Sequence, residues 1–238
     1  MGPRILILGS GPDAPQAANW DRSIFDHIVV INNAWRVRSD WSHLIHPEDF
    51  SADKRPATVS PPQKIITADD YVTVQNTYGG FVYAGGTMAF TAGYWALGAL
   101  RPSVMAFFGC DMMYAAQGNT HFYGTGTADP LREDISLRSL EAKSARLALH
   151  ANAQGCSVVN LSDAPSRQVF PRAKLADIRH LQTTPPPPSD VAMADVLGAE
   201  KSLGYFVASG RYWESSAQFD VDEIDRLDAM WRAAYLPS

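Results

Sequence analysis

The nine residues at positions 4–12 read Arg-Ile-Leu-Ile-Leu-Gly-Ser-Gly-Pro, and they decide the fold. A short aliphatic run that ends at glycines and a proline predicts a buried strand followed by a tight turn. Helix-like segments follow at 88–100 and 135–153. Strands that alternate with helices are typical of an α/β fold, so we expect a doubly wound, mostly parallel, Rossmann-like sheet. Further apolar runs share the strand pattern, at 28–31, 104–108 and 156–161.

Residues 43–75 are harder to read because prolines interrupt them. Short strands are expected there at Lys64–Ile66 and 71–74. The long helix at 135–153 carries its leucines on one stripe, with Lys143 and Arg146 on other faces. Arg146 is therefore expected to be solvated.

A run of four prolines at 185–188 predicts a stiff linker of polyproline type. It divides the chain into a Rossmann-like nucleotide-binding domain, residues 1–183, and a Pro-rich linker with a helical tail, residues 184–238. The segment Val221–Tyr235 has the apolar spacing of an amphipathic helix. We expect this C-terminal helical extension to pack on the main domain or on a partner. The sequence leaves open whether the chain forms a homo-oligomer through it.

Composition limits the classes of function. The chain has 238 residues, 46% of them hydrophobic, and a net charge of −5. A negative chain is not expected to bind nucleic acid by neutralising phosphates. Cys110 and Cys156 are too few for a disulfide framework and are expected to be buried free thiols. No apolar stretch is long enough to span a bilayer and no signal peptide is evident, so the sequence predicts a cytoplasmic protein.

The segment after the apolar run 104–108 holds the densest group of reactive side chains, among them Asp111, His121 and Tyr123. In open α/β sheets, ligands bind just beyond the carboxyl ends of the strands. His121 is the candidate base, because the ordinary pKa of histidine suits proton transfer near neutrality. Asp111 is expected to orient it or to contact substrate. The alternative is a histidine that binds Asp111 or Asp129 only to order the loop.

The turn Gly9-Ser10-Gly11 formally fits the start of the dinucleotide fingerprint. Its glycines would let backbone N–H groups approach a phosphate at the start of a helix. An NAD enzyme also needs an acidic residue at the end of the second strand to bind the ribose. This chain has Asn32 and Asn33 there. The turn therefore favours a nucleotide other than NAD, with a tight turn that binds no ligand as the alternative.

Basic and metal-binding side chains give weaker signals. Arg167 follows the last strand and would lie at the carboxyl edge of the sheet, where a guanidinium suits a phosphate or an anionic sugar. Arg138 and Arg146 lie on the long helix and are expected to be solvated. His43 and His46 match no metal-ligand spacing, so no metal site is expected.

Taken in order, the motifs resemble glycosyltransferase family 42, the bacterial sialyltransferases that use CMP-sialic acid. They also resemble the related MptE-like domain of motility accessory factors and archaeal 6-hydroxymethylpterin diphosphokinases. The resemblance covers about residues 4–172. It rests on Ile-Leu-Gly-Ser-Gly-Pro at 7–12, a strand that ends at Asn32, Gly85-Gly86-Thr87, Phe107-Phe108-Gly109-Cys110-Asp111, and His121-Phe122-Tyr123-Gly124.

This resemblance implies an inverting, metal-independent glycosyltransferase with a CMP-sugar donor and a surface glycan acceptor, and no cofactor besides that substrate. One alternative is an MptE-like diphosphokinase that uses ATP and Mg²⁺, for which only Asp111 and Asp129 resemble ligands. The resemblance assigns nucleotide contacts to Gly9, Ser10 and Gly11 at the phosphates, Asn32 at the ribose or base, and Gly85, Gly86 and Thr87 at a second helix start.

The chain departs from the sialyltransferase pattern at two positions. Thr125 stands where that pattern has a second histidine, the catalytic base, so His121 is left as the candidate base. Met113 stands where the pattern has a tyrosine that steadies the departing phosphate, and Tyr114 or Tyr123 would replace it. A catalytically silent nucleotide-binding module is therefore a further alternative.

Overall fold

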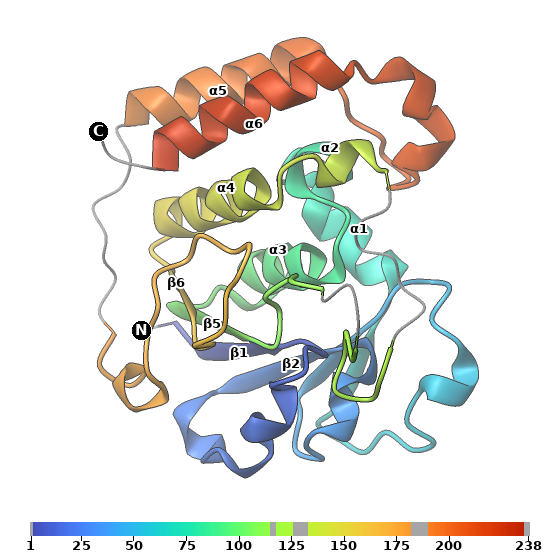
Figure 1. Cartoon of the computed structure of the whole chain (residues 1–238), viewed down its shortest axis with the longest axis vertical. Coiled ribbons are helices and arrows are strands. Elements are labelled where there is room, and N and C mark those ends of the chain that lie inside the picture. Colours follow the sequence, from blue (N-terminus) through green and yellow to red (C-terminus); the bar gives the residue numbers. More distant parts are fainter. Residues whose placement is uncertain (1, 115–117, 126–132, 182–189, 236–238) are drawn as a thin grey trace.

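The structure is a computed structural model that describes residues 2–114, 118–125, 133–181 and 190–235. Figure 1 shows a central sheet with α-helices layered on one face and loops with short helices on the other. All six strands are parallel, in the order β4-β3-β2-β1-β5-β6, which confirms the Rossmann-like α/β fold. The strands are β1 Arg4–Leu8, β2 His27–Ile31, β3 His43–Ile45, β4 Lys64–Ile66, β5 Val104–Phe108 and β6 Ser157–Asn160.

The helices fill the connections between strands and form the C-terminal part of the chain. The α-helices are α1 Ala68–Asn76, α2 Phe81–Ala84, α3 Met88–Leu100, α4 Leu140–Ala153, α5 Asp190–Leu203 and α6 Val221–Tyr235. The 3-10 helices are η1 Ala14–Asn19, η2 Arg22–Ile24, η3 Asn32–Arg36, η4 Ala52–Lys54, η5 Ile135–Leu137, η6 Leu175–Asp177 and η7 Tyr212–Gln218.

Strand β1 lies at the centre of the sheet and is apolar on both faces. Ile5 and Ile7 pack with the apolar side chains of α3 and α4, whereas Leu6 and Leu8 pack on the opposite side with those around η1 and η3. A strand buried on both faces has no polar alternation, which explains the continuous aliphatic run in the sequence. The strand order reverses between β1 and β5, and the ends of these two strands mark the switch point of the sheet.

The expected strand at 71–74 is wrong, because these residues lie inside α1. Thr67 begins the helix with a capping box, in which the Thr67 N–H donates to the Asp70 carboxylate at 2.9 Å. The Thr67 and Asp70 spacing was a helix signal that the strand prediction overlooked. The predicted helix over 135–153 is also split, into η5 and α4. Ser139 caps α4 by accepting a bond from the Ala142 N–H at 3.2 Å.

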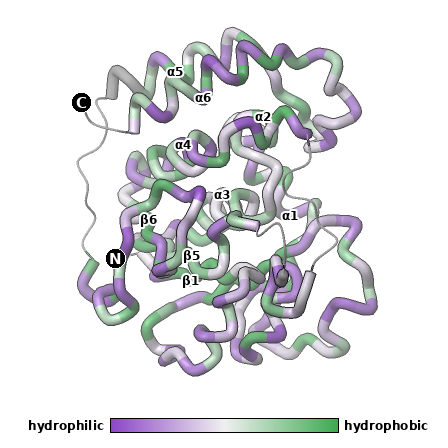
Figure 2. The backbone as a smooth tube through the Cα atoms, in the orientation of Figure 1, coloured by the Kyte–Doolittle hydropathy of each residue, from purple (hydrophilic) through white to green (hydrophobic). Residues whose placement is uncertain are grey.

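The C-terminal hairpin, formed by α5, the connector of residues 204–220 and α6, packs over α4 (Figure 1). This confirms that the tail covers the main domain. Figure 2 shows hydrophilic and hydrophobic residues alternating along α6. Its buried residues are Ile224, Leu227, Asp228 and Trp231. The amphipathic pattern of this helix therefore serves contacts within the chain.

The hairpin also overturns the expectation that Arg146 is solvated, and it covers Lys143 as well. Both side chains are buried, since α4 is covered by the sheet layer on one side and by the hairpin on the other. The Lys143 ammonium donates to Asp228 at 2.7 Å, and the Arg146 guanidinium binds the Glu200 carboxylate. Arg138 does lie at the surface, where it pairs with Asp225.

Two smaller expectations can be compared with the described residues. Cys110 and Cys156 are both free and buried, as predicted. Among the described helices, none has the length and apolar character needed to cross a bilayer. The proline run at 185–188 lies outside the described residues.

We expect acid to destabilise the protein partly through His43 on β3. Burial is the main reason that the pKa of His43 falls from 6.5 to about 4, and nearby His27 and Lys64 lower it further. Between these two pH values the unfolded chain binds a proton at this position and the folded chain does not. The free energy of unfolding therefore decreases as the pH falls from 6.5 towards 4.

Urea unfolding across this pH interval measures the effect. The His43→Gln variant cannot titrate at this position, so its free energy of unfolding should decline less steeply than that of the unaltered protein. Equal slopes for the two proteins would mean that His43 does not carry the proton linkage.

Candidate functional site

The ends of β1 and β5 contact each other through glycines. The Gly9 N–H donates to the Phe108 carbonyl and the Gly11 N–H to the Gly109 carbonyl, both at 2.8 Å. A Cβ atom at Gly9 would collide with the Gly109 carbonyl, so the close approach of the two loops requires glycine there. These two amide groups are bonded to the end of β5 and are not available to a phosphate.

The segment after β1 is the six-residue 3-10 helix η1, not an α-helix. Pro12 precedes η1 and Pro15 lies within its first turn, where a missing N–H is tolerated. The turn therefore lacks the long helix whose dipole stabilises phosphates in the dinucleotide fold. Contact of a nucleotide with Ser10, or with the glycines through atoms other than these two N–H groups, stays a prediction.

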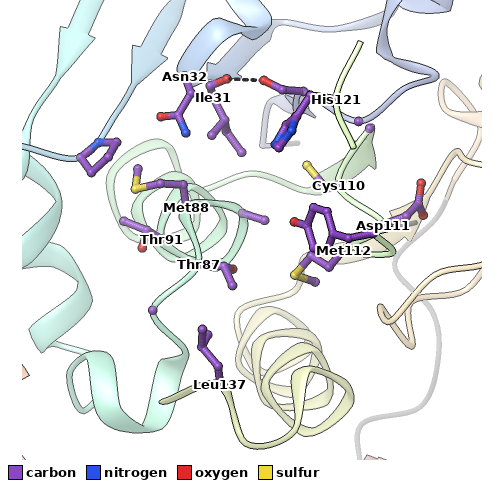
Figure 3. A pocket seen from close by; sticks show the side chains of 18 of the residues that line it. Ile31, Asn32, Thr87, Met88, Thr91, Cys110, Asp111, Met112, His121 and Leu137 are labelled. Atoms are coloured by element: carbon purple, nitrogen blue, oxygen red, sulfur yellow. Dashed lines mark hydrogen bonds between the residues drawn. The ribbon is translucent and has the colours of Figure 1, made fainter. Parts of the chain in front are cut away.

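A cavity of about 950 Å³ opens at this switch point (Figure 3). Its size is near the upper end of the range for small-molecule sites. Asn33, Gly85 and Arg167 are not among its lining residues. The cavity does bring together most of the predicted site: Gly9, Ser10, Gly11, Asn32, Gly86, Thr87, Asp111, Tyr114, His121 and Tyr123.

The His121 loop is attached to the glycine turn by its backbone. The Phe122 N–H donates to the Ser10 carbonyl at 3.1 Å, and His121 and Gly124 exchange two backbone hydrogen bonds at 3.0 Å. In Figure 3 the His121 ring lies between Asn32 and Cys110 at the wall of the cavity. Burial lowers the pKa of His121 below 6.5, so the imidazole is neutral at pH 7.

Two tyrosines surround His121. The Tyr123 ring stacks on the imidazole with centroids 5.1 Å apart and planes inclined by 20°, and the Tyr114 ring lies 6.1 Å away. Burial raises the pKa of Tyr114 to about 12. Its phenol therefore stays protonated at neutral pH and is a hydrogen-bond donor.

Asp111 does not orient His121. Its carboxylate accepts a bond from the Asn160 side-chain amide at 3.0 Å and lies 3.9 Å from the Arg172 guanidinium. In Figure 3 the carboxyl group points away from His121. The ring nitrogen Nδ1 of His121 is instead 2.9 Å from the Thr120 hydroxyl. Asp129, the other carboxylate considered for this role, lies outside the described residues.

Asn32 lines the cavity with a polar side chain whose acceptor oxygen is unused. It ends β2 with a left-handed φ of +52°, a conformation that asparagine tolerates better than most residues. Its Oδ1 is buried and has no hydrogen-bond partner among the described residues, although Asn32 lines the cavity. A buried unpaired oxygen is costly, so a ligand donor at this position would remove the cost. Asn33 is buried outside the cavity.

Gly85 and Gly86, the second pair of glycines in the predicted site, precede helix α3. Gly85 packs against Phe90 and Lys143, outside the cavity lining, whereas the Gly86 N–H donates to the Ser136 hydroxyl at 3.0 Å. Thr87 caps α3 by accepting a bond from the Phe90 N–H at 3.3 Å. The first residues of this 13-residue helix line the cavity, where its dipole favours an anion.

Arg167 is outside the cavity because Glu141 on α4 binds it. Two nitrogens of the Arg167 guanidinium, Nε and Nη2, donate to that carboxylate, the second at 3.0 Å. The guanidinium that does line the cavity belongs to Arg211, which is 3.3 Å from the Glu48 carboxylate. Arg211 lies on the connector, in the part of the sequence that was predicted only as a tail.

The connector is the part of the site that sequence reasoning missed. Its residues 209–213 line the cavity about a hundred positions after the His121 loop. The Tyr212 hydroxyl donates to Asp134 at 2.7 Å and accepts from the Ser136 hydroxyl at 3.0 Å. A Cβ at Gly86 would collide with the Tyr212 hydroxyl, so this side chain fills the space that the glycine leaves. No local pattern in the sequence indicates this contact.

Comparisons with known proteins add no family assignment. No protein-family model, no curated protein and no solved structure matches the chain. Within the described residues, no group of three or more histidine, cysteine or acidic side chains is arranged to hold a metal ion.

Proposed function

We propose that the protein is a nucleotide-sugar-dependent glycosyltransferase that inverts the anomeric centre without a metal, with a CMP-sugar donor and a surface glycan acceptor. The observation that supports this most is the shared cavity, in which a neutral His121 and the unpartnered Oδ1 of Asn32 lie at the switch point of the sheet. We propose the cytoplasm as the compartment, which suits two free thiols.

The donor nucleotide would bind between β2 and α3. The Asn32 Oδ1 would accept a hydrogen bond from a ribose hydroxyl or from the amino group of cytosine. This bond would give the buried oxygen the donor that it lacks. The phosphate would lie at the start of α3, beside Thr87, where the helix dipole stabilises negative charge. The Tyr114 hydroxyl would donate to the leaving phosphate as its charge increases.

His121 would act as the general base. The Thr120 hydroxyl, as acceptor from the Nδ1 proton, would leave the lone pair on Nε2 to remove a proton from the acceptor hydroxyl. That oxygen attacks the anomeric carbon, the new C–O bond forms on the face opposite the nucleotide, and the bond to the phosphate breaks. The nucleotide leaves with the bonding electrons, and the proton remains on His121.

Calorimetric titration with CMP, UDP, NAD and ATP tests the donor site. We expect CMP to bind most tightly. The Asn32→Gly variant keeps the left-handed backbone but removes the amide, and it should bind CMP roughly tenfold more weakly. Asn119→Gly is the matched control, because Asn119 is exposed on the His121 loop and does not line the cavity. Preference for NAD, or equal loss in both variants, would overturn the proposed site.

The silent nucleotide-binding module is the second candidate, and one observation favours it. Thr125, at the position of the second histidine, donates from its hydroxyl to the Gly118 carbonyl and does not line the cavity. The module predicts CMP binding with no cleavage of CMP-sugars. Magnesium-dependent binding of ATP in preference to CMP would instead favour the diphosphokinase.

A further inference from the structure

Three exposed apolar side chains line the cavity. Among the described residues, the large apolar side chains that line it yet remain exposed are Met113, Tyr123 and Trp213, with exposed fractions of 50%, 41% and 58%. Ligand cavities are lined largely by apolar and aromatic side chains, which contact the ligand that enters. These exposed side chains are therefore accessible to a ligand that enters the cavity.

Trp213 is presented on a fixed support. Its neighbour Tyr212 is buried, hydrogen-bonded through its hydroxyl to Asp134, and stacked on Phe81 with centroids 6.4 Å apart. The Trp213 and Tyr212 rings meet edge to face at 5.5 Å. Because Tyr212 is held on several sides, the exposed indole needs little ordering to bind a flat apolar surface.

Charges near Trp213 disfavour an anionic ligand. Arg211 lies 3.3 Å from the Glu48 carboxylate and 3.9 Å from that of Glu214, so its guanidinium is already balanced by two carboxylates. Asp49 also lines the cavity. Carboxylates accept hydrogen bonds from hydroxyl groups but repel a carboxylated sugar.

We propose that Trp213 forms a subsite for a neutral pyranose, with the apolar face of the sugar ring on the indole and its hydroxyls directed to Glu48 and Asp49. This subsite would hold the acceptor sugar in the proposed transferase, so its role in transfer rests on the proposed function. Its sugar binding is independent of the donor. The connector residues then select the acceptor, while the sheet edge binds the donor.

Saturation-transfer NMR on the whole chain tests the subsite with two probes, methyl β-galactopyranoside and the corresponding methyl galacturonoside. We expect the neutral probe to bind weakly but measurably, and Trp213→Ala to weaken it by roughly five- to tenfold. Phe206→Ala is the matched control, because Phe206 is an exposed aromatic of the same connector, at 49%, that does not line the cavity. It should leave binding unchanged.

The outcomes separate this inference from the proposed function. Equal binding of both probes, or no effect of Trp213→Ala, would overturn the subsite, whatever the CMP titration shows. Loss of sugar binding in Trp213→Ala with unchanged CMP affinity supports it. If no nucleotide binds but the neutral sugar still depends on Trp213, the transferase proposal fails and the sugar site stands. A folded Trp213→Ala protein is verified by its near-ultraviolet circular dichroism.

Discussion

Glu200→Gln is expected to lower the free energy of unfolding by about 3–5 kcal/mol. The Glu200 carboxylate on α5 accepts from Arg146 through Nε and Nη2, both at 2.8 Å, and from the Trp231 indole N–H at 2.7 Å. Both charged side chains are buried. Glutamine keeps the size but removes the charge, so the Arg146 cation would be left in the interior without a counter-charge.

Urea unfolding followed by circular dichroism measures the loss. Asp225→Asn is the matched control, because Asp225 pairs with Arg138 between the same helix layers but at the surface. An exposed ion pair of this kind contributes about 0–1 kcal/mol. Similar losses in the two variants would show that the buried pair has no special importance for stability.

A third variant separates the charge from the packing. Replacing both partners, Arg146→Met with Glu200→Leu, removes the buried charges together. Such a replacement often recovers much of the loss caused by removing one partner. The Tyr94 hydroxyl and the Tyr78 carbonyl, which accept from Arg146, would still need new donors. We therefore expect the double variant to be more stable than Glu200→Gln and less stable than the unaltered protein.

His121→Ala is expected to reduce the rate of sugar transfer from a CMP-sugar by about 10²- to 10⁴-fold, the usual contribution of a general base. CMP affinity should change little, because the proposed donor contacts are made by Asn32, Tyr114 and the start of α3. His180→Ala is the control, since His180 is an exposed histidine outside the cavity. Release of CMP from the donor, in the presence of acceptor, measures the rate.

The pH profile distinguishes a base from a residue that only shapes the loop. Burial lowers the pKa of His121 below 6.5. The neutral form that accepts a proton is then populated at pH 7 and is lost only as the pH falls through this lowered pKa. The rate should be constant near neutrality and fall in acid, and His121→Ala should lack that fall. Full activity in His121→Ala would show that a group other than His121 is the base.

Much of the fold could be predicted because its signals are local. The continuous aliphatic runs of β1 and β5 reflect strands buried on both faces, and such runs with glycine at their ends are distinctive. The three-residue strand β3 was not predicted, whereas β4, which is equally short, was predicted with its observed bounds. The residues at 71–74 favour a strand by themselves, and the capping box that marks helix α1 begins before them, at Thr67.

Apart from Gly86 and Thr87, which the resemblance implied, the predicted site residues that line the cavity follow the ends of strands. Asn32 and the loop with His121 reach the cavity because the carboxyl ends of neighbouring parallel strands meet at one edge. The partners of Asp111 and Arg167 come from other elements, Asn160 and Glu141, and the sequence does not show which side chains meet across a fold. The solvated position expected for Arg146 was wrong for the same reason, because the sequence of a helix does not show which other helices pack on its polar face.

Tyr212 connects the C-terminal part of the chain to the cavity, through its hydrogen bond to Asp134 and the close fit of its hydroxyl against Gly86. This connection has a consequence for how such a chain evolves. The proline run suggests a natural place to cut or to fuse, yet one wall of the cavity is supplied from beyond it. An exchange of the last fifty residues would thus transplant one wall of the cavity along with the helices. Domain borders drawn from linkers and borders drawn from the cavity lining do not coincide in this molecule.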